Sequence, residues 1–93
     1  MYKIVYSKRF KKSVKKINKS GDKKDISKLK KLILTLSANE ILNSKYKDHN
    51  LSGDMSIYRE CHVNADLLLI YEKNENEKVI SLINIGNHSD LFE

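Results

Sequence analysis

Apolar residues recur along the chain with two spacings, which predict strands and helices in turn. Residues 2–6 alternate and are rich in β-prone side chains, so they predict a first strand. Ser7 follows and is a residue that favours the cap of a helix. Phe10, Val14 and Ile17 then recur at helical spacing with lysines between them, which predicts a first helix.

A second helix is predicted after a short interruption. Gly21 is suited to end the first helix and Asp22 to cap the second. The apolar stripe of the second helix consists of Ile26, Leu29, Leu32, Ile33 and Leu36. We expect the two helices to form a hairpin that packs on an apolar surface.

The second half predicts strands. Residues 38–54 are rich in turn formers and predict a loop. Three β-rich runs follow, at residues 56–63, 66–73 and 78–85, with a turn at 74–77 and a short turn or helical cap at 87–93. The middle run is apolar on both faces and is expected inside the sheet.

The element order β-α-α-β-β-β predicts an α+β fold of one domain, residues 1–93. We expect the helix hairpin to cover one face of a largely antiparallel four-stranded sheet, with the first strand at or near an edge. The other face would be free to hold a site.

The composition indicates a cytoplasmic protein. No run approaches the roughly 20 apolar residues of a membrane span, and no apolar segment of a secretory signal opens the chain. Cys61 is the only cysteine, so no internal disulfide is expected.

Positive charge is concentrated in the predicted helices. Residues 7–31 hold Arg9 and eleven lysines against two aspartates, a net charge of +10, so the other residues carry −4 of the total of +6. Such a stripe suits a polyanion, most simply nucleic acid, or it is a solvated helix face that only aids solubility.

Three histidines, His49, His62 and His88, lie in the second half near acids and amides. If residues 63–65 form a three-residue hairpin loop, His62 and Asp66 lie opposite each other and share a face. A two-residue loop would pair His62 with Leu67 instead. Histidine beside a carboxylate suits proton transfer near neutral pH.

A metal site and a cysteine nucleophile are less favoured. Cys61 and His62 are adjacent on a predicted strand and point to opposite faces, and paired-ligand motifs are absent. Histidines on a basic body suit metal-free RNA cleavage, in which a ribose 2′-hydroxyl attacks the adjacent phosphate. One group accepts its proton, another protonates the departing 5′-oxygen, and cations stabilise the charge.

Four ordered motifs, at residues 46–53, 58–63, 66–71 and 85–92, resemble the YafQ branch of the RelE/ParE toxin superfamily. The resemblance implies a RelE-like fold and a type II toxin, a ribosome-dependent endoribonuclease that cleaves mRNA without a cofactor. It implies three kinds of partner: a cognate antitoxin, the ribosome with its mRNA, and operator DNA only through the antitoxin complex. It also implies active-site roles for five residues: His49, His62, Asp66, His88 and Phe92.

The sequence departs from the resembled pattern at a cationic position. The family carries an arginine four residues before the last histidine, where this chain has Asn84. Lys45, Lys47 or Arg59 are candidates to replace its charge on the phosphate, although Arg59 also suits a structural ion pair. Two alternatives therefore stay open: a weak or inactive binding protein with the same fold, and a ParE-like gyrase inhibitor.

Overall fold

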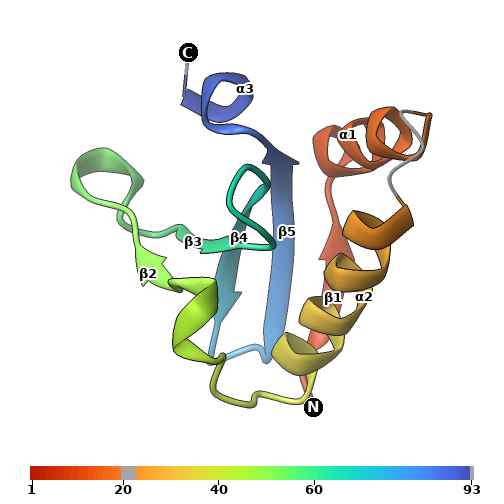
Figure 1. Ribbon diagram of the computed structural model, residues 1–93. Helices are drawn as coiled ribbons and strands as arrows, with labels where there is room; N and C mark the ends of the chain where they lie inside the picture. Colours follow the sequence, from red (N-terminus) through yellow and green to blue (C-terminus); the bar gives the residue numbers. More distant parts are fainter. Residues whose placement is uncertain (20–22, 93) are drawn as a thin grey trace.

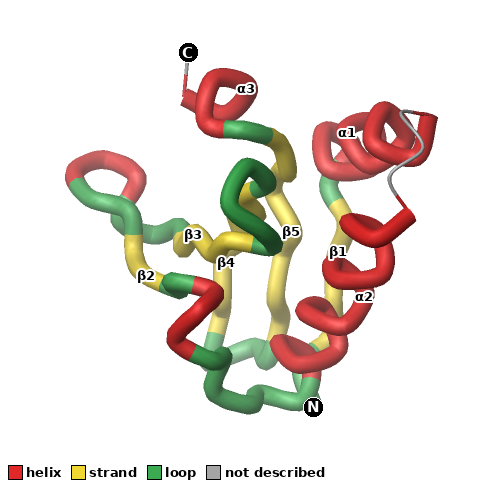
Figure 2. The backbone as a smooth tube through the Cα atoms, viewed as in Figure 1, coloured by secondary structure: helices red, strands yellow, loops and turns green. Residues whose placement is uncertain are grey.

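The computed structural model describes residues 1–19 and 23–92, so the predicted helix end at Gly21 and cap at Asp22 lie outside the described residues. In chain order, the helices and strands follow the predicted order β-α-α-β-β-β, with two short 3₁₀ turns, one short strand and a short C-terminal helix added (Figures 1 and 2). The elements are β1 (Lys3–Tyr6), α1 (Lys8–Lys19), α2 (Lys23–Ser37), η1 (Ser44–Tyr46), β2 (His49–Asn50), η2 (Gly53–Met55), β3 (Arg59–His62), β4 (Leu68–Asn74), β5 (Val79–Gly86) and α3 (His88–Phe92).

The sheet has five strands in the order β1-β5-β4-β3-β2, one more than predicted. The additional strand, β2, lies inside the segment expected to be a loop. It pairs antiparallel with β3, and two residues are too short to give a periodic signal. The other neighbours are antiparallel except β1, which runs parallel to β5 at the edge, as expected for the first strand. The apolar strand β4 lies in the interior of the sheet, also as predicted.

The two long helices pack on the sheet through the predicted stripes. Phe10 of α1 and three leucines of α2 are buried with inward side chains of β3, β4 and β5, including Cys61, Leu69 and Leu82. Ser7 caps α1 as predicted, because its Oγ accepts the backbone N–H of Phe10 at 3.0 Å. Among the described residues, none of the helices is long and apolar enough to cross a membrane.

Two strands begin later than predicted. The run 56–63 is a strand only from Arg59, because Ser56 and Tyr58 donate backbone hydrogen bonds that close the turn at η2. The run 66–73 is a strand only from Leu68, and His62 pairs with Leu68. The loop between β3 and β4 therefore has five residues, 63–67, and both pairings considered for His62, with Asp66 and with Leu67, are wrong.

Candidate active site

A buried carboxylate joins two of the three histidines. Glu60 of β3 lies directly opposite His49 of β2, and His62 lies two residues along β3 on the same face. Oε1 of Glu60 is 3.8 Å from Nε2 of His49 and 3.6 Å from Nε2 of His62. The Glu60 side chain is only 10% exposed, and a protonated imidazole at either histidine would balance its charge.

The ring of His49 is oriented by the backbone. Its Nδ1 lies 2.6 Å from the carbonyl oxygen of Lys47, which can only accept a hydrogen bond, so Nδ1 carries a proton. Nε2 then faces Glu60. Lys47 has a left-handed backbone conformation (φ 50°) at the end of η1, and this turn aims its carbonyl at the ring.

A pocket of about 310 Å³ brings together three of the predicted catalytic residues. It is lined by His62, Ala65, Asp66, Leu68, Asn87, His88 and Ser89. Asp66 reaches this pocket from the β3–β4 loop, although it does not pair with His62. The pocket therefore gathers two imidazoles and an exposed carboxylate around a space open to substrate.

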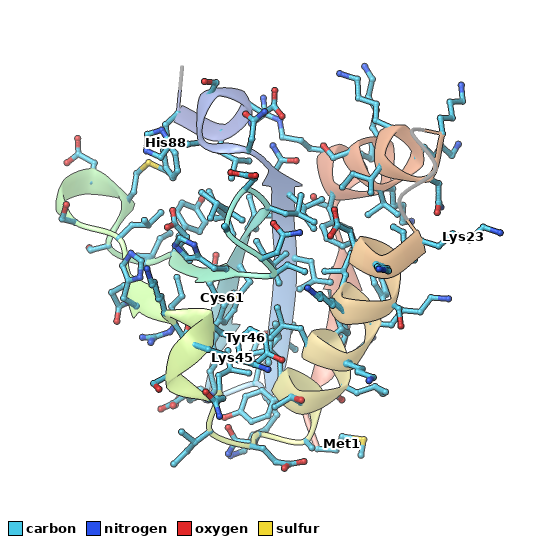
Figure 3. The ribbon with its side chains drawn as sticks, in the orientation of Figure 1. Met1, Lys23, Lys45, Tyr46, Cys61 and His88 are labelled. Atoms are coloured by element: carbon cyan, nitrogen blue, oxygen red, sulfur yellow. The ribbon has the colours of Figure 1, made fainter. Side chains whose placement is uncertain are left out.

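The short helix α3 holds the third histidine. Asn87 and Asp90 cap its first turn reciprocally: Asn87 Oδ1 accepts from the Asp90 N–H at 2.8 Å, and Asp90 Oδ2 from the Asn87 N–H at 3.2 Å. A Cβ on Gly86 would come within 3.0 Å of Asp90 Cβ, so a glycine is needed for this approach. The His88 and Phe92 rings pack with centroids 4.9 Å apart. Figure 3 shows His88 on α3, far from Lys45 and Tyr46.

Arg59 lies in an ion-pair network on the other face of β3. Its Nε and Nη2 donate to the two oxygens of Asp48 at 3.3 and 3.0 Å, and its Nη1 donates to Asn50. Tyr71 donates to Asp48 as well, at 2.6 Å. The hydrogen bond to Asp48 raises the pKa of Arg59, and burial raises the pKa of Tyr71. The structural ion pair considered for Arg59 is thus present.

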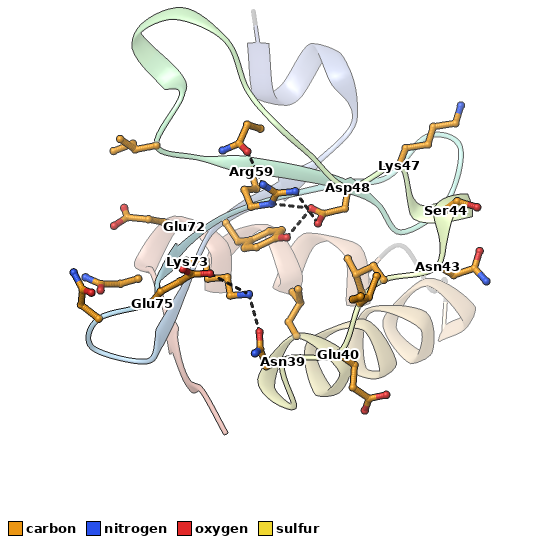
Figure 4. Close-up of a pocket in the computed structure, with 18 residues that line it drawn as sticks. Asn39, Glu40, Asn43, Ser44, Lys47, Asp48, Arg59, Glu72, Lys73 and Glu75 are labelled. Atoms are coloured by element: carbon orange, nitrogen blue, oxygen red, sulfur yellow. Dashed lines mark hydrogen bonds and ion pairs between the residues drawn. The ribbon is translucent and has the colours of Figure 1, made fainter.

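This network lines a second hollow of the surface, whose lining residues do not include the histidines. The hollow, about 980 Å³, lies between the loop after α2 and the β4–β5 turn, and Lys47 is on its rim (Figure 4). Two of its polar residues, Lys73 and Asn39, are hydrogen-bonded to each other. The smaller pocket holds three of the residues predicted to be catalytic, and we therefore take it as the candidate active site.

Asn84 is held by the first helix. Its Oδ1 accepts the Ser13 hydroxyl at 2.7 Å and the backbone N–H of Ile85 at 2.8 Å. It does not line the pocket with His62 and His88. Asn84 is nevertheless close in sequence to the pocket wall. Gly86, two residues later on β5, pairs with Leu68, which lines the pocket.

Cys61 is fully buried among the core residues, and burial raises the pKa of its thiol, which keeps it protonated and unreactive. Within residues 1–19 and 23–92, no group of three or more His, Cys, Asp or Glu side chains is arranged to hold a metal ion.

Glu60 is not among the residues that the sequence predicted for the site. The sequence pattern could have indicated Glu60, because residues two apart on a strand share a face and Glu60 lies two residues before His62. Its contact with His49 was not predictable, since β2 was not expected. Of the predicted site residues, three line one pocket: His62, Asp66 and His88. His49 faces Glu60, which also faces His62. Phe92 packs against the ring of His88.

Residues 2–93 match the family described as the bacterial toxin of the type II toxin–antitoxin system, YafQ. The chain is 39% identical over 90 residues to the mRNA interferase toxin YafQ of Escherichia coli K12, covering 96% of this chain and 94% of the relative.

Solved structures agree with this match. The Escherichia coli DinJ–YafQ complex has a chain with a TM-score of 0.89 at 35% identity, with full coverage of both chains. A metal-bound toxin from Helicobacter pylori gives a TM-score of 0.90 at 40% identity, covering 99% of this chain and 100% of the other. A family match over almost the whole length, supported by relatives of this identity, means that the chain belongs to the YafQ family of bacterial type II toxins.

Proposed function

We propose that residues 1–93 act as one toxin domain, an endoribonuclease that cleaves mRNA on the ribosome and is silenced by a cognate antitoxin in the cytoplasm. The observation that carries the catalytic part is the pocket that holds His62, Asp66 and His88 beside one another. Family membership supports the substrate, since the Escherichia coli relative is an mRNA interferase.

The proposed reaction is transfer of the phosphate to the neighbouring ribose oxygen. The 2′-oxygen attacks phosphorus as its proton passes to a base, and the bond to the 5′-oxygen breaks as an acid gives that oxygen a proton. His88 on α3 and His62 on β3 lie in the same pocket and are the two proton carriers. The products are a cyclic phosphate and a free 5′-hydroxyl, so no water or cofactor is consumed.

The remaining residues have supporting roles. Asp66 orients an imidazole or shares in proton transfer from the pocket wall. His49 and Glu60 form the outer part of the site, where an imidazolium at either histidine would face the carboxylate. Phe92 presents an aromatic surface on which a base can stack. Lys47 is the predicted cation for the phosphate; its backbone carbonyl contacts the His49 ring, and the residue lines the other hollow.

The test is primer extension on a defined mRNA, with and without translating ribosomes. With the wild-type chain, we expect new RNA ends that appear only when ribosomes are present. In His88→Ala, the cleavage rate should fall by at least about 100-fold, which is the usual contribution of an acid or base. Asn76→Ala, on the exposed β4–β5 turn, is the control. Full cleavage by His88→Ala would overturn the assignment.

The basic helices are the proposed contact for polyanionic or acidic partners. Lys11, Lys12, Lys15 and Lys16 are all exposed on α1. Ribosomal RNA and an acidic antitoxin segment would be attracted by the same charge, and inhibition would then be competition. Changing all four to Glu should weaken binding of at least one of these partners strongly, and changing them to Gln should weaken it less. Unchanged affinity for both partners would reject the proposal.

A non-catalytic binding protein of the same fold is the second candidate, because Asn84 stands where the resembled pattern has an arginine. This candidate predicts translation arrest without new RNA ends in the same experiment.

A further inference from the structure

The loop that carries Asp66 is organised by one side chain, that of Asn64. Its Oδ1 accepts the backbone N–H groups of Asp66 and Leu67, at 2.8 and 2.9 Å. The backbone N–H groups of Val63 and Asn64 in turn donate to the Leu67 carbonyl, at 2.8 and 3.3 Å. The five-residue loop is thus closed around the Asn64 amide, which resembles the Asx turns that fix short loops.

The same amide ties the loop to the second helix. Nδ2 of Asn64 donates to Oδ1 of Asp25 at 2.5 Å, across 39 positions of sequence. Asp25 is in the first turn of α2, where a carboxylate is also favoured by the helix dipole. A hydrogen bond to a carboxylate is about twice as strong as one between neutral groups. Both side chains are partly buried, which protects this contact from water.

The part of the loop that carries Asp66 lies at the surface. Asp66 and Ala65 are exposed, and the buried side chains of the loop are those at its two ends, Val63 and Leu67. Without the Asn64 tether, the backbone between these ends would regain conformational freedom, because the loss of backbone entropy on ordering would no longer be offset. The pocket position of the Asp66 carboxylate therefore depends on a bond made on the other side of the loop, to α2.

We infer that Asn64 is a positioning residue for the RNA-cleaving site, which holds Asp66 in place through its hydrogen bond to Asp25. The inference rests on the role of Asp66 proposed above. It assigns a function to two residues that are not in the pocket, and it links the basic helix α2 to the loop that carries Asp66 through a side-chain hydrogen bond.

The two sides of this contact can be exchanged. Asn64→Asp keeps the acceptor for both loop N–H groups but replaces the donor with a carboxylate that faces Asp25, so the tether becomes a repulsion. Asp25→Asn alone keeps an acceptor for Asn64 and is the matched control. In the double variant Asp25→Asn/Asn64→Asp, the amide at 25 donates to the carboxylate at 64. The tether returns although position 64 still carries the new negative charge.

Three measurements separate positioning from stability. We expect Asn64→Asp to lower the single-turnover cleavage rate at saturating toxin by about 10- to 100-fold, as for other small misplacements of reacting groups. The toxin concentration for half-maximal rate should stay unchanged. ¹⁵N relaxation should show a looser backbone at Asp66 and Leu67. The double variant should restore the rate and the rigidity, and thermal unfolding identifies the folded variants.

The outcomes are distinct. A rigid loop in folded Asn64→Asp, or a double variant as slow as Asn64→Asp, overturns the inference. If the loop loosens and cleavage stays at the wild-type rate, the inference also fails, and Asp66→Ala in the same assay shows whether the proposed role of Asp66 failed with it. If Asn64→Asp does not fold, Asn64→Ser replaces it, because the shorter hydroxyl can accept within the loop but cannot reach Asp25.

Discussion

Oε1 of Glu60 lies 3.6 Å from Nε2 of His62, inside a site where the carboxylate is nearly buried. When His62 gains a proton during the reaction, this carboxylate faces the new charge, as the aspartate does in a catalytic triad. Glu60→Gln keeps the shape and removes the charge. We expect the saturated cleavage rate to fall about tenfold or more, with thermal stability kept. A wild-type rate in folded Glu60→Gln would mean that the charge is not used.

Phe92 is predicted to act on substrate binding. Its ring packs against His88 at 4.9 Å between centroids, and stacking of a base on an aromatic ring is worth about 1–3 kcal/mol. Phe92→Leu should therefore raise the toxin concentration for half-maximal cleavage by about fivefold or more, whereas Phe92→Tyr should change it little. Equal concentrations for wild type and Phe92→Leu would remove Phe92 from the substrate contacts.

The sequence predicted those features that depend on periodicity. The helix faces of Phe10 and Leu29 and the interior position of β4 follow from spacing of apolar residues alone. Features that depend on single polar contacts were not predictable. The length of the 63–67 loop is set by the Asn64 side chain, and this moved Asp66 out of register with His62.

The same limit applies to the candidate site. The resemblance pointed to His62, Asp66 and His88, which the fold brings to one pocket from a strand, a loop and a helix. Asn84 was considered for substrate contact, but its orientation toward Ser13 depends on how α1 packs along β5. Such side-chain directions follow from tertiary packing, which a local pattern does not encode.

The Asp48–Arg59 ion pair is predicted to stabilise the fold. Arg59 donates to both Asp48 oxygens, and Tyr71 adds a third hydrogen bond to the same carboxylate. Asp48→Asn should lower the free energy of unfolding by about 1.5–3 kcal/mol, the usual range for hydrogen bonds to charged groups. Urea denaturation measures it. Glu75→Gln, which breaks the exposed pair with Lys73, should cost about 0.5 kcal/mol or less; equal losses in both variants would contradict the prediction.

Alkaline pH is predicted to destabilise the fold through Cys61 and Tyr71. Burial, together with nearby carboxylates, raises the pKa of the Cys61 thiol, and burial and the Asp48 hydrogen bond raise the pKa of Tyr71. Above about pH 8.5 the unfolded chain loses the thiol proton and above about pH 10 the phenol proton, while the folded chain keeps both. The folded state then binds more protons, so stability falls as pH rises.

Urea midpoints between pH 7 and 10.5 check this prediction. The decline should be shallower in Cys61→Ala from about pH 8.5 and in Tyr71→Phe from about pH 10, whatever the absolute loss of stability in each variant. Parallel curves for wild type and both variants would show that other groups cause the decline.

Asn84→Arg is predicted to speed cleavage. An arginine at this position of β5 would bring a cation toward the pocket wall, since Gly86, two residues later, pairs with Leu68. A charged donor at a developing negative charge is typically worth about 100- to 1000-fold, and we expect a gain of about tenfold or more because the pocket is adapted to a neutral residue. Arginine cannot accept the Ser13 hydroxyl, so a stability loss of about 1 kcal/mol should accompany it. Asn84→Gln keeps the amide without the charge and is the control. If the arginine variant folds and cuts no faster than Asn84→Gln, the missing cation does not limit the reaction.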